Sequence, residues 1–154
     1  MKVSQIMRQP VISLREEDSL EEAARIMLEN DLRGVPVIND RGQISGFLSV
    51  SDFLAKDKSF PFSRFHAPQL FGKWLPKEGI ERIYEEARTT PVKEIMSAGV
   101  VIVSEDATVE EVVELMLRRD LNRIPVVRDG VPVGIVARFD LLKLMVEQGK
   151  LKEI

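Results

Sequence analysis

The sequence predicts a mixed α/β (α+β) fold in which two tandem copies of one motif pack with pseudo-twofold symmetry, with an aromatic-rich, partly helical insert between them. Three observations predict this fold. The chain repeats itself at an offset of 89 residues, so that Val3 recurs as Val92. Each copy has a stretch of helical apolar periodicity. Each copy then has two β-rich runs around a glycine-containing turn.

The repeat preserves spacing, polarity and turn residues along each copy. Its offset falls to 88 after the hairpin turn, where Asp129-Gly130 stands in place of the longer Asp40-Arg41-Gly42. Turns tolerate such a deletion. The matched positions are Val3/Val92, Ile6/Ile95, Met7/Met96, Ser19/Thr108, Glu22/Glu111, Val35/Ile124, Pro36/Pro125, Gly46/Gly134 and Asp52/Asp140.

Both copies predict the same order of elements. The first helix of each copy begins with a capping box, in which the hydroxyl of Ser19 or Thr108 accepts from a backbone N–H and a glutamate three residues later reaches back. The expected elements are a helical turn (3–7 and 92–96), an extended run (11–14 and 100–103), a helix from 20 or 109, strands at 35–38, 44–49, 124–127 and 133–137, and a last helix from about 52 or 140.

Size predicts that the copies depend on each other. One copy of this length can barely bury a core alone, so we expect the two to pack sheet to sheet with a cleft between them. The expected division is a first copy at 1–54, an insert at 55–90, a second copy at 91–146 and a C-terminal tail at 147–154.

The insert is aromatic, and its second half predicts an amphipathic helix over residues 80–87. Thr90 before Pro91 indicates an N-cap followed by a proline at the first helical position. We interpret the rings as anchors that hold the insert on the two copies or on a second subunit; the alternative is that one ring covers a ligand. His66 has no second His or Cys, which argues against a metal site.

Composition excludes several classes of function. A net charge of -3 argues against nucleic acid as the partner. The absence of cysteine excludes disulfides and thiolate catalysis. No run approaches the roughly 20 apolar residues of a membrane span, and the N-terminus lacks the apolar stretch of a signal peptide. We therefore expect a cytoplasmic protein that binds neither nucleic acid nor membrane.

The turn from the last strand of each copy into its last helix is the best candidate for chemistry. Ser49 and Asp52 are spaced to form a further capping box. The same residues could also bind a ligand, because Asp52 can accept from a ribose diol and Ser49 can donate to a phosphate or a ribose oxygen. The second copy has Ala137 in place of the serine, so Asp140 has no hydroxyl partner, and this favours another use for the acid. Arg123 precedes the hairpin and suits a phosphate.

No catalytic grouping is evident in the sequence. With one His, no Cys and no glycine-rich phosphate loop, we do not expect an enzyme.

The paired motifs, each with an apolar-Pro-apolar-apolar strand and a Gly-x-x-Ser-x-x-Asp type of ending, resemble a pair of CBS domains (a Bateman module) over roughly residues 1–54 and 90–146. The resemblance implies a regulatory ligand that contains adenosine, such as AMP, ADP, ATP or S-adenosylmethionine, and no required cofactor. It also implies that the acids hold the ribose and that a basic residue meets the phosphates. The residues it assigns to the ligand are Ser13, Val35, Pro36, Ser49, Asp52, Arg123, Ile124, Pro125 and Asp140.

Two functions remain open at this stage. The first is a sensor that acts in trans on an effector protein or on its own assembly, and the second is a dimerisation scaffold with vestigial pockets. Ile102 and Ala137 replace polar residues of the motif in the second copy and favour the scaffold slightly. Members of the family form homodimers, so the resemblance also predicts a homodimer.

Overall fold

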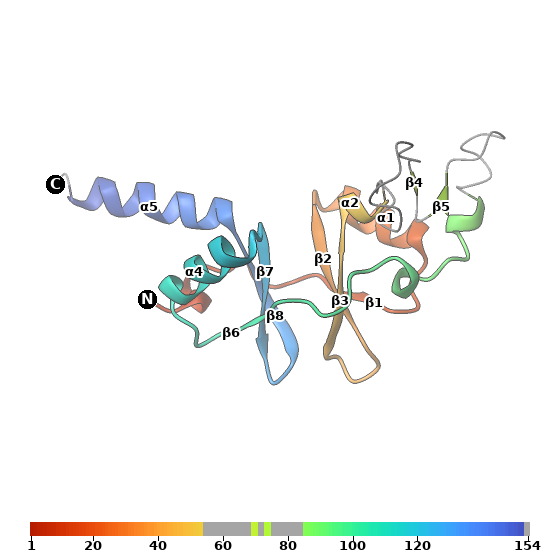
Figure 1. The fold of residues 1–154 in the computed structure, drawn as a ribbon, viewed down its shortest axis with the longest axis horizontal. Helices are drawn as coiled ribbons and strands as arrows, with labels where there is room; N and C mark the ends of the chain where they lie inside the picture. The colour runs from red at the N-terminus through yellow and green to blue at the C-terminus, as the bar shows by residue number, and fades with distance from the viewer. Residues whose placement is uncertain (54–68, 71–72, 75–84, 153–154) are drawn as a thin grey trace. The chain divides into compact units, whose positions relative to one another are not determined.

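A computed structural model describes residues 1–53, 69–70, 73–74 and 85–152 (Figure 1). Its elements are η1 (Val3–Gln5), β1 (Leu14–Arg15), α1 (Leu20–Glu29), β2 (Gly34–Ile38), β3 (Ile44–Ser49), α2 (Val50–Phe53), β4 (Gln69–Leu70), β5 (Lys73–Trp74), η2 (Val92–Glu94), β6 (Val103–Ser104), α4 (Val109–Arg119), β7 (Arg123–Arg128), β8 (Val131–Ala137) and α5 (Arg138–Lys152).

The predicted mixed α/β fold is confirmed, with one three-stranded sheet from each copy. The strand orders are β1-β2-β3 and β6-β7-β8, and the first pair of each sheet is parallel. In each sheet the edge strand β1 or β6 has only two residues, because its pairing is confined to Leu14 and Arg15 or to Val103 and Ser104. The extended runs therefore become strands only at their ends.

The chain forms two compact units, and these units do not coincide with the two copies along the sequence. Unit 1 contains residues 1–12, 42–44 and 101–154, and unit 2 contains residues 13–41 and 45–100. The opening turn of each copy has thus joined the sheet of the other copy. Val3 is fully buried in the core of unit 1, and Val92 is fully buried in the core of unit 2.

Backbone hydrogen bonds hold each exchanged segment in place. The N–H of Val3 donates to the carbonyl of Ala107 at 2.8 Å, and the N–H of Val92 donates to the carbonyl of Asp18 at 2.8 Å. Farther along, Arg8 pairs with Ile135 and Ser97 pairs with Phe47, each as an isolated antiparallel bridge. These bridges pair backbone groups of β8 and β3 that would otherwise lie at the free edge of a sheet.

The two helix caps differ in detail from their prediction. Thr108 and Glu111 form the full capping box, with reciprocal bonds of 3.2 and 2.8 Å. At Ser19 the hydroxyl accepts from the N–H of Glu22 at 3.1 Å. The carboxylate of Glu22 instead binds the guanidinium of Arg25. An ion pair one helical turn away has thus replaced the second half of the box.

The hairpin turn of the second copy shows where one residue is missing relative to the first copy. Asp129 and Gly130 connect β7 to β8 with φ values of 53° and 80°. Two positive φ values in a two-residue loop define the type I′ turn, whose twist matches that of the strands. The loss of one residue from the repeat therefore leaves a tight two-residue turn between β7 and β8.

Little of the insert falls within the described residues. Residues 85–87 are helical, β4 and β5 pair antiparallel, and Ala87 is buried in the core of unit 2. The prediction that Thr90 caps the next turn is wrong, because Pro91 is the N-cap residue of η2. The Thr90 hydroxyl instead donates to the carbonyl of Glu86 at 2.8 Å. The interpretations of the aromatic rings and of His66 lie outside the described residues.

No helix in the part of the chain that the structure describes combines the length and the apolar character needed to cross a membrane.

Gly134 on β8 has no room for a side chain. A Cβ atom there would lie 2.5 Å from Sδ of Met7 and 3.0 Å from the carbonyl oxygen of Arg8. Gly134→Ala should therefore lower the free energy of unfolding by about 1–3 kcal/mol, measured by urea denaturation. Gly149 of α5 is the matched control, because a Cβ there meets nothing within 4 Å. Gly149→Ala should be neutral or stabilise by up to about 1 kcal/mol, and equal losses in both variants would contradict this packing.

Candidate functional site

The candidate acids occupy equivalent places in the two copies. The N–H of Ser49 donates to Oδ2 of Asp52 at 2.7 Å, and the N–H of Ala137 donates to Oδ2 of Asp140 at 2.8 Å. Each acid thus reaches back three residues to the end of the preceding strand. This bond fixes the side-chain rotamer in the same way in both copies.

The hydroxyl of Ser49 is also engaged within the turn. It lies 3.1 Å from Oδ2 of Asp52 and 2.7 Å from the hydroxyl oxygen of Ser51. The carboxylate half of the expected capping box is therefore present. The same half is present at Asp140, so this acid caps the turn through the backbone N–H although it has no hydroxyl partner. Its role as a cap needs only the backbone N–H of residue 137, and the loss of the hydroxyl does not remove it.

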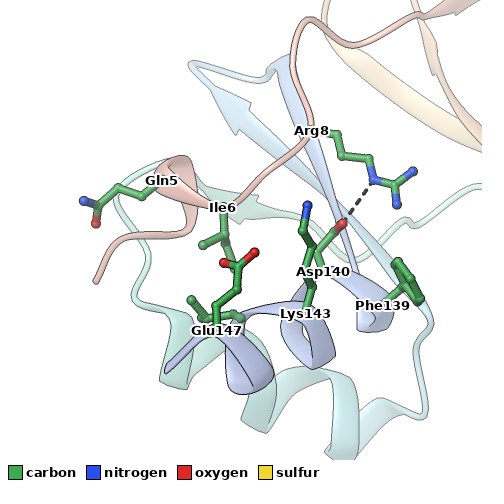
Figure 2. A pocket seen from close by; sticks show the side chains of 8 residues that line it. Gln5, Ile6, Arg8, Phe139, Asp140, Lys143 and Glu147 are labelled. Carbon is green, nitrogen blue, oxygen red and sulfur yellow. Dashed lines mark hydrogen bonds and ion pairs between the residues drawn. The ribbon is translucent and has the colours of Figure 1, made fainter. Parts of the chain in front are cut away.

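Asp140 differs from Asp52 in its second oxygen. Nε of Arg8 donates to Oδ1 of Asp140 at 3.1 Å, as Figure 2 shows. The Asp140 side chain is only 11% exposed, whereas that of Arg8 is 66% exposed. The ion pair therefore joins a nearly buried acid to a cation whose far end lies in solvent.

The backbone places Arg8 at this position. The N–H of Arg8 donates to the carbonyl of Ile135 at 2.8 Å, and the N–H of Ile135 donates to the carbonyl of Arg8 at 3.1 Å. Arg8 was not among the predicted site residues. Arg8 and Asp140 are 132 residues apart, and only the exchange of the opening segments brings them together. The one signal in the sequence is that Arg8 corresponds to Ser97 in the repeat.

A cavity of about 420 Å³ opens beside this ion pair within unit 1. Its lining combines two basic groups, two acidic groups and an aromatic ring, and the labelled side chains surround it in Figure 2. The lining residues are Gln5, Ile6, Arg8, Phe139, Asp140, Lys143, Leu144 and Glu147. Such a lining suits a small ligand that carries both a flat apolar ring and a charged group.

The corresponding position in unit 2 is a serine. Ser97 takes the position of Arg8, and its backbone exchanges two bonds of 2.9 Å with Phe47. Oδ2 of Asp52 carries both bonds from Ser49, and Oδ1 makes no hydrogen bond to any residue that the structure describes. The two acids therefore share a backbone setting and differ in charge environment.

The remaining predicted residues divide into core and periphery. Val35 and Ile124 are fully buried in the cores of units 2 and 1, and Pro36 and Pro125 beside them are also buried. Arg123 is half-buried at the start of β7 and is in register with Ala137. The structure thus brings Arg123 to the end of the sheet where α5, which carries Asp140 in its first turn, begins.

Ser13 lies one residue before β1 and is half-buried. Ile102, which takes its place in the second copy, is exposed. No group of three or more His, Cys, Asp or Glu side chains suited to a metal ion occurs among the residues described above.

Comparisons with known proteins agree with this architecture. The family model for the CBS domain matches the chain twice, at residues 3–59 and 92–147. The uncharacterized protein MJ1404 of Methanocaldococcus jannaschii is 29% identical over 149 residues, which are 97% of this chain and 33% of that protein. The chain thus spans about a third of the length of this curated relative.

Solved structures show the same fold. The CBS domain of a CBS domain containing membrane protein from Sphaerobacter thermophilus has a TM-score of 0.74 and 34% identity, covering 94% of this chain and 87% of that one. The CBS domain pair of protein MJ0100, solved with 5'-methylthioadenosine and S-adenosyl-L-methionine, has a TM-score of 0.68 at 22% identity and covers 96% and 98% of the two chains. CBSX2, solved with AMP, has a TM-score of 0.70 at 22% identity and covers 96% and 98%. Because its two copies both match the family model and together they account for most of the sequence, this chain belongs to the CBS domain family.

Proposed function

We propose that this chain is a regulatory module that binds an adenosine-containing ligand and acts in trans on a partner protein or on its own assembly. The observation that carries the proposal is the pair of equivalent carboxylates, Asp52 and Asp140, each oriented by a backbone N–H three residues earlier. A carboxylate fixed in this way can accept hydrogen bonds from the two hydroxyls of a ribose with little further loss of side-chain entropy.

The ligands of related structures support an adenosine group. MJ0100 was solved with two adenosine derivatives and CBSX2 with AMP. The shared chemical feature of these ligands is adenosine, and their substituents differ in charge. For this chain we propose AMP, ADP, ATP or S-adenosylmethionine, held through Asp52 and Asp140, with Arg123 near the phosphate.

Regulation by such a ligand has an energetic condition. A ligand shifts an equilibrium only by its difference in affinity for the two states. Typical couplings are about 1–3 kcal/mol, which a few hydrogen bonds to charged groups can supply. We assign no catalytic step, because the proposed contacts position a ligand and supply no nucleophile with its base.

A second candidate function, assembly through a homodimer, is favoured by the exposed face of α5. Phe139, Leu142, Met145 and Val146 recur at helical spacing and are all more than half exposed. Leu28 of α1 and Leu117 of α4, which match in the repeat, are 82% and 70% exposed. Large apolar side chains clustered on a surface, as along α5, are typical of an interaction site. A second copy of this chain is the occupant we propose.

Ligand binding should raise thermal stability. AMP at a hundred times its dissociation constant should add about 2.7 kcal/mol, or roughly 5–10 °C in Tm for a chain of this length. A thermal-shift panel with AMP, ADP, ATP, S-adenosylmethionine and a guanine nucleotide measures this. A shift with the guanine compound alone, or with none of the panel on ligand-free protein, would reject the adenosine assignment.

Asp52→Asn should separate the capping role of the acid from binding. The amide oxygen can still accept from the N–H of Ser49, but the second oxygen is lost as an acceptor for a hydroxyl. Calorimetry should then show AMP binding at this site weakened by about tenfold or more, with Tm of the free protein nearly unchanged. Asp106→Asn is the control, because Asp106 is an exposed acid paired with Lys2 at 3.0 Å. Equal affinity in both variants would remove Asp52 from the site.

The dimer proposal is tested on α5. Met145→Glu places a charge in the apolar face and should shift the mass measured by light scattering from dimer to monomer. Gln148→Glu adds the same charge to an exposed polar position of the same helix and should leave the dimer intact. A monomeric wild-type protein, or a dimer that survives Met145→Glu, would contradict the assignment of this face.

A further inference from the structure

The two equivalent acids are not equally available to a ligand. Oδ1 of Asp140 is already bound by Nε of Arg8, whereas Oδ1 of Asp52 makes no hydrogen bond within the described part of the chain. In both acids Oδ2 accepts from the backbone N–H of the residue three positions earlier. A ribose hydroxyl that approaches Asp140 therefore meets an oxygen that already accepts a bond from a cation, and at Asp52 no residue that the structure describes donates to the corresponding oxygen.

Arg8 is built to exchange partners without moving its backbone. Its main chain is bonded on both sides to Ile135, and only the flexible side chain reaches Asp140. The side chain is mostly exposed, and its two terminal amino groups make no hydrogen bond to any described residue. Figure 2 shows these groups pointing away from the carboxylate. A planar guanidinium with free donors is well suited to a phosphate.

We propose that Arg8 makes ligand binding at Asp140 depend on a negatively charged group such as a phosphate. This inference rests on the proposed function and concerns the selectivity of one of its two acids. A phosphate binds the guanidinium and draws it off Oδ1, and the freed carboxylate then accepts the ribose hydroxyls. An uncharged nucleoside gains no such bond, and its hydroxyls have to share Oδ1 with Arg8 or displace it. Hydrogen bonds between charged groups are stronger than neutral ones, so a bond to Arg8 that only the charged ligand makes can select between the two ligands.

The repeat supplies the contrast within the same molecule. Ser97, at the position of Arg8, carries no charge, so the Asp52 site has no reason to distinguish AMP from adenosine by this route. The two sites thus differ in the charge of ligand they accept. One accepts adenosine with or without a phosphate, and the other requires the phosphate.

The test uses the full chain carrying Asp52→Ala, so that binding reports on the Asp140 site. Calorimetry measures the dissociation constants of AMP and adenosine with and without Arg8→Gln. We expect AMP to bind at least about tenfold more tightly than adenosine when Arg8 is present. Arg8→Gln should tighten adenosine and weaken AMP, so that their ratio falls by about tenfold.

Lys2→Gln is the matched control. Lys2 lies in the same N-terminal segment and pairs with Asp106 at 3.0 Å, an exposed ion pair of the same unit. This substitution should leave the AMP-to-adenosine ratio unchanged. A merely structural role for Arg8 would weaken both ligands together and leave the ratio unchanged, and that result would overturn the proposal.

Failure of this inference can be told apart from failure of the proposed function. If the wild-type chain binds AMP but the Asp52→Ala chain binds neither ligand, Asp140 holds no phosphate-dependent site. The present inference and the ligand contact assigned to Asp140 then fall, and the proposed binding at Asp52 stands. If the wild-type chain binds no adenosine compound at all, both fall. If the ratio is the same with arginine and with glutamine at position 8, the module still binds its ligand and Arg8 has no part in selecting it.

Discussion

The arrangement of this molecule depends on two short backbone bridges, Arg8 with Ile135 and Ser97 with Phe47. Each bridge fixes the opening segment of one copy to the last strand of the other, pairing backbone groups at the edge of a three-stranded sheet. The close approach demands glycine at the adjacent strand position, since a Cβ on Gly134 would collide with Met7 and a Cβ on Gly46 would collide with Met96. Val3 of the first copy is buried in a core formed mainly by the second copy, and Val92 of the second copy is buried in a core formed mainly by the first. Neither unit has its core or its paired edge without a segment from the other copy.

The same bridges explain how a duplicated backbone gives two equivalent acids unlike surroundings. Because the backbone of residues 8 and 97 is held in equivalent places, a single difference of side chain at that position changes the surroundings of an acid more than a hundred residues away. Arginine neutralises Asp140, and serine leaves Oδ1 of Asp52 without a bond among the described residues. The strand order of the two sheets is shared, and so is the bond from the backbone N–H of residue 49 or 137 to its acid. The surroundings of the two acids therefore differ in side-chain charge on an equivalent backbone.

The sequence predicted the elements well wherever local rules decide them. Thr108 and Glu111 formed their box, and the hairpin strands lie within about two residues of their expected limits. Prediction failed where another nearby group competed. Arg25, three residues after Glu22, binds the Glu22 carboxylate, and the carbonyl of Glu86, four residues before Thr90, accepts from the Thr90 hydroxyl. The sequence predicted Asp52 and Asp140, but it missed Arg8, because periodicity assigns a segment to its own copy and contains no sign that the segment has crossed to the other.

Helix α5 connects the candidate site to the face that we assign to assembly. Asp140 lies in its first turn, and Leu142 and Met145 follow on its exposed side within two turns. A helix is stiff over such a length, because each residue is tied by backbone bonds to the next turn. Leu141, on another side of α5, packs against the core of unit 1, so the helix is fixed to the unit that holds the site. A ligand that changes the hydrogen-bond partner of Asp140 therefore acts on the first turn of α5, the same helix that carries the exposed apolar side chains. Binding is then coupled to assembly if the ligand-bound and the ligand-free forms of the start of α5 differ in their affinity for a second copy. The hydrogen bonds that Arg8 exchanges with the ligand supply this difference in free energy.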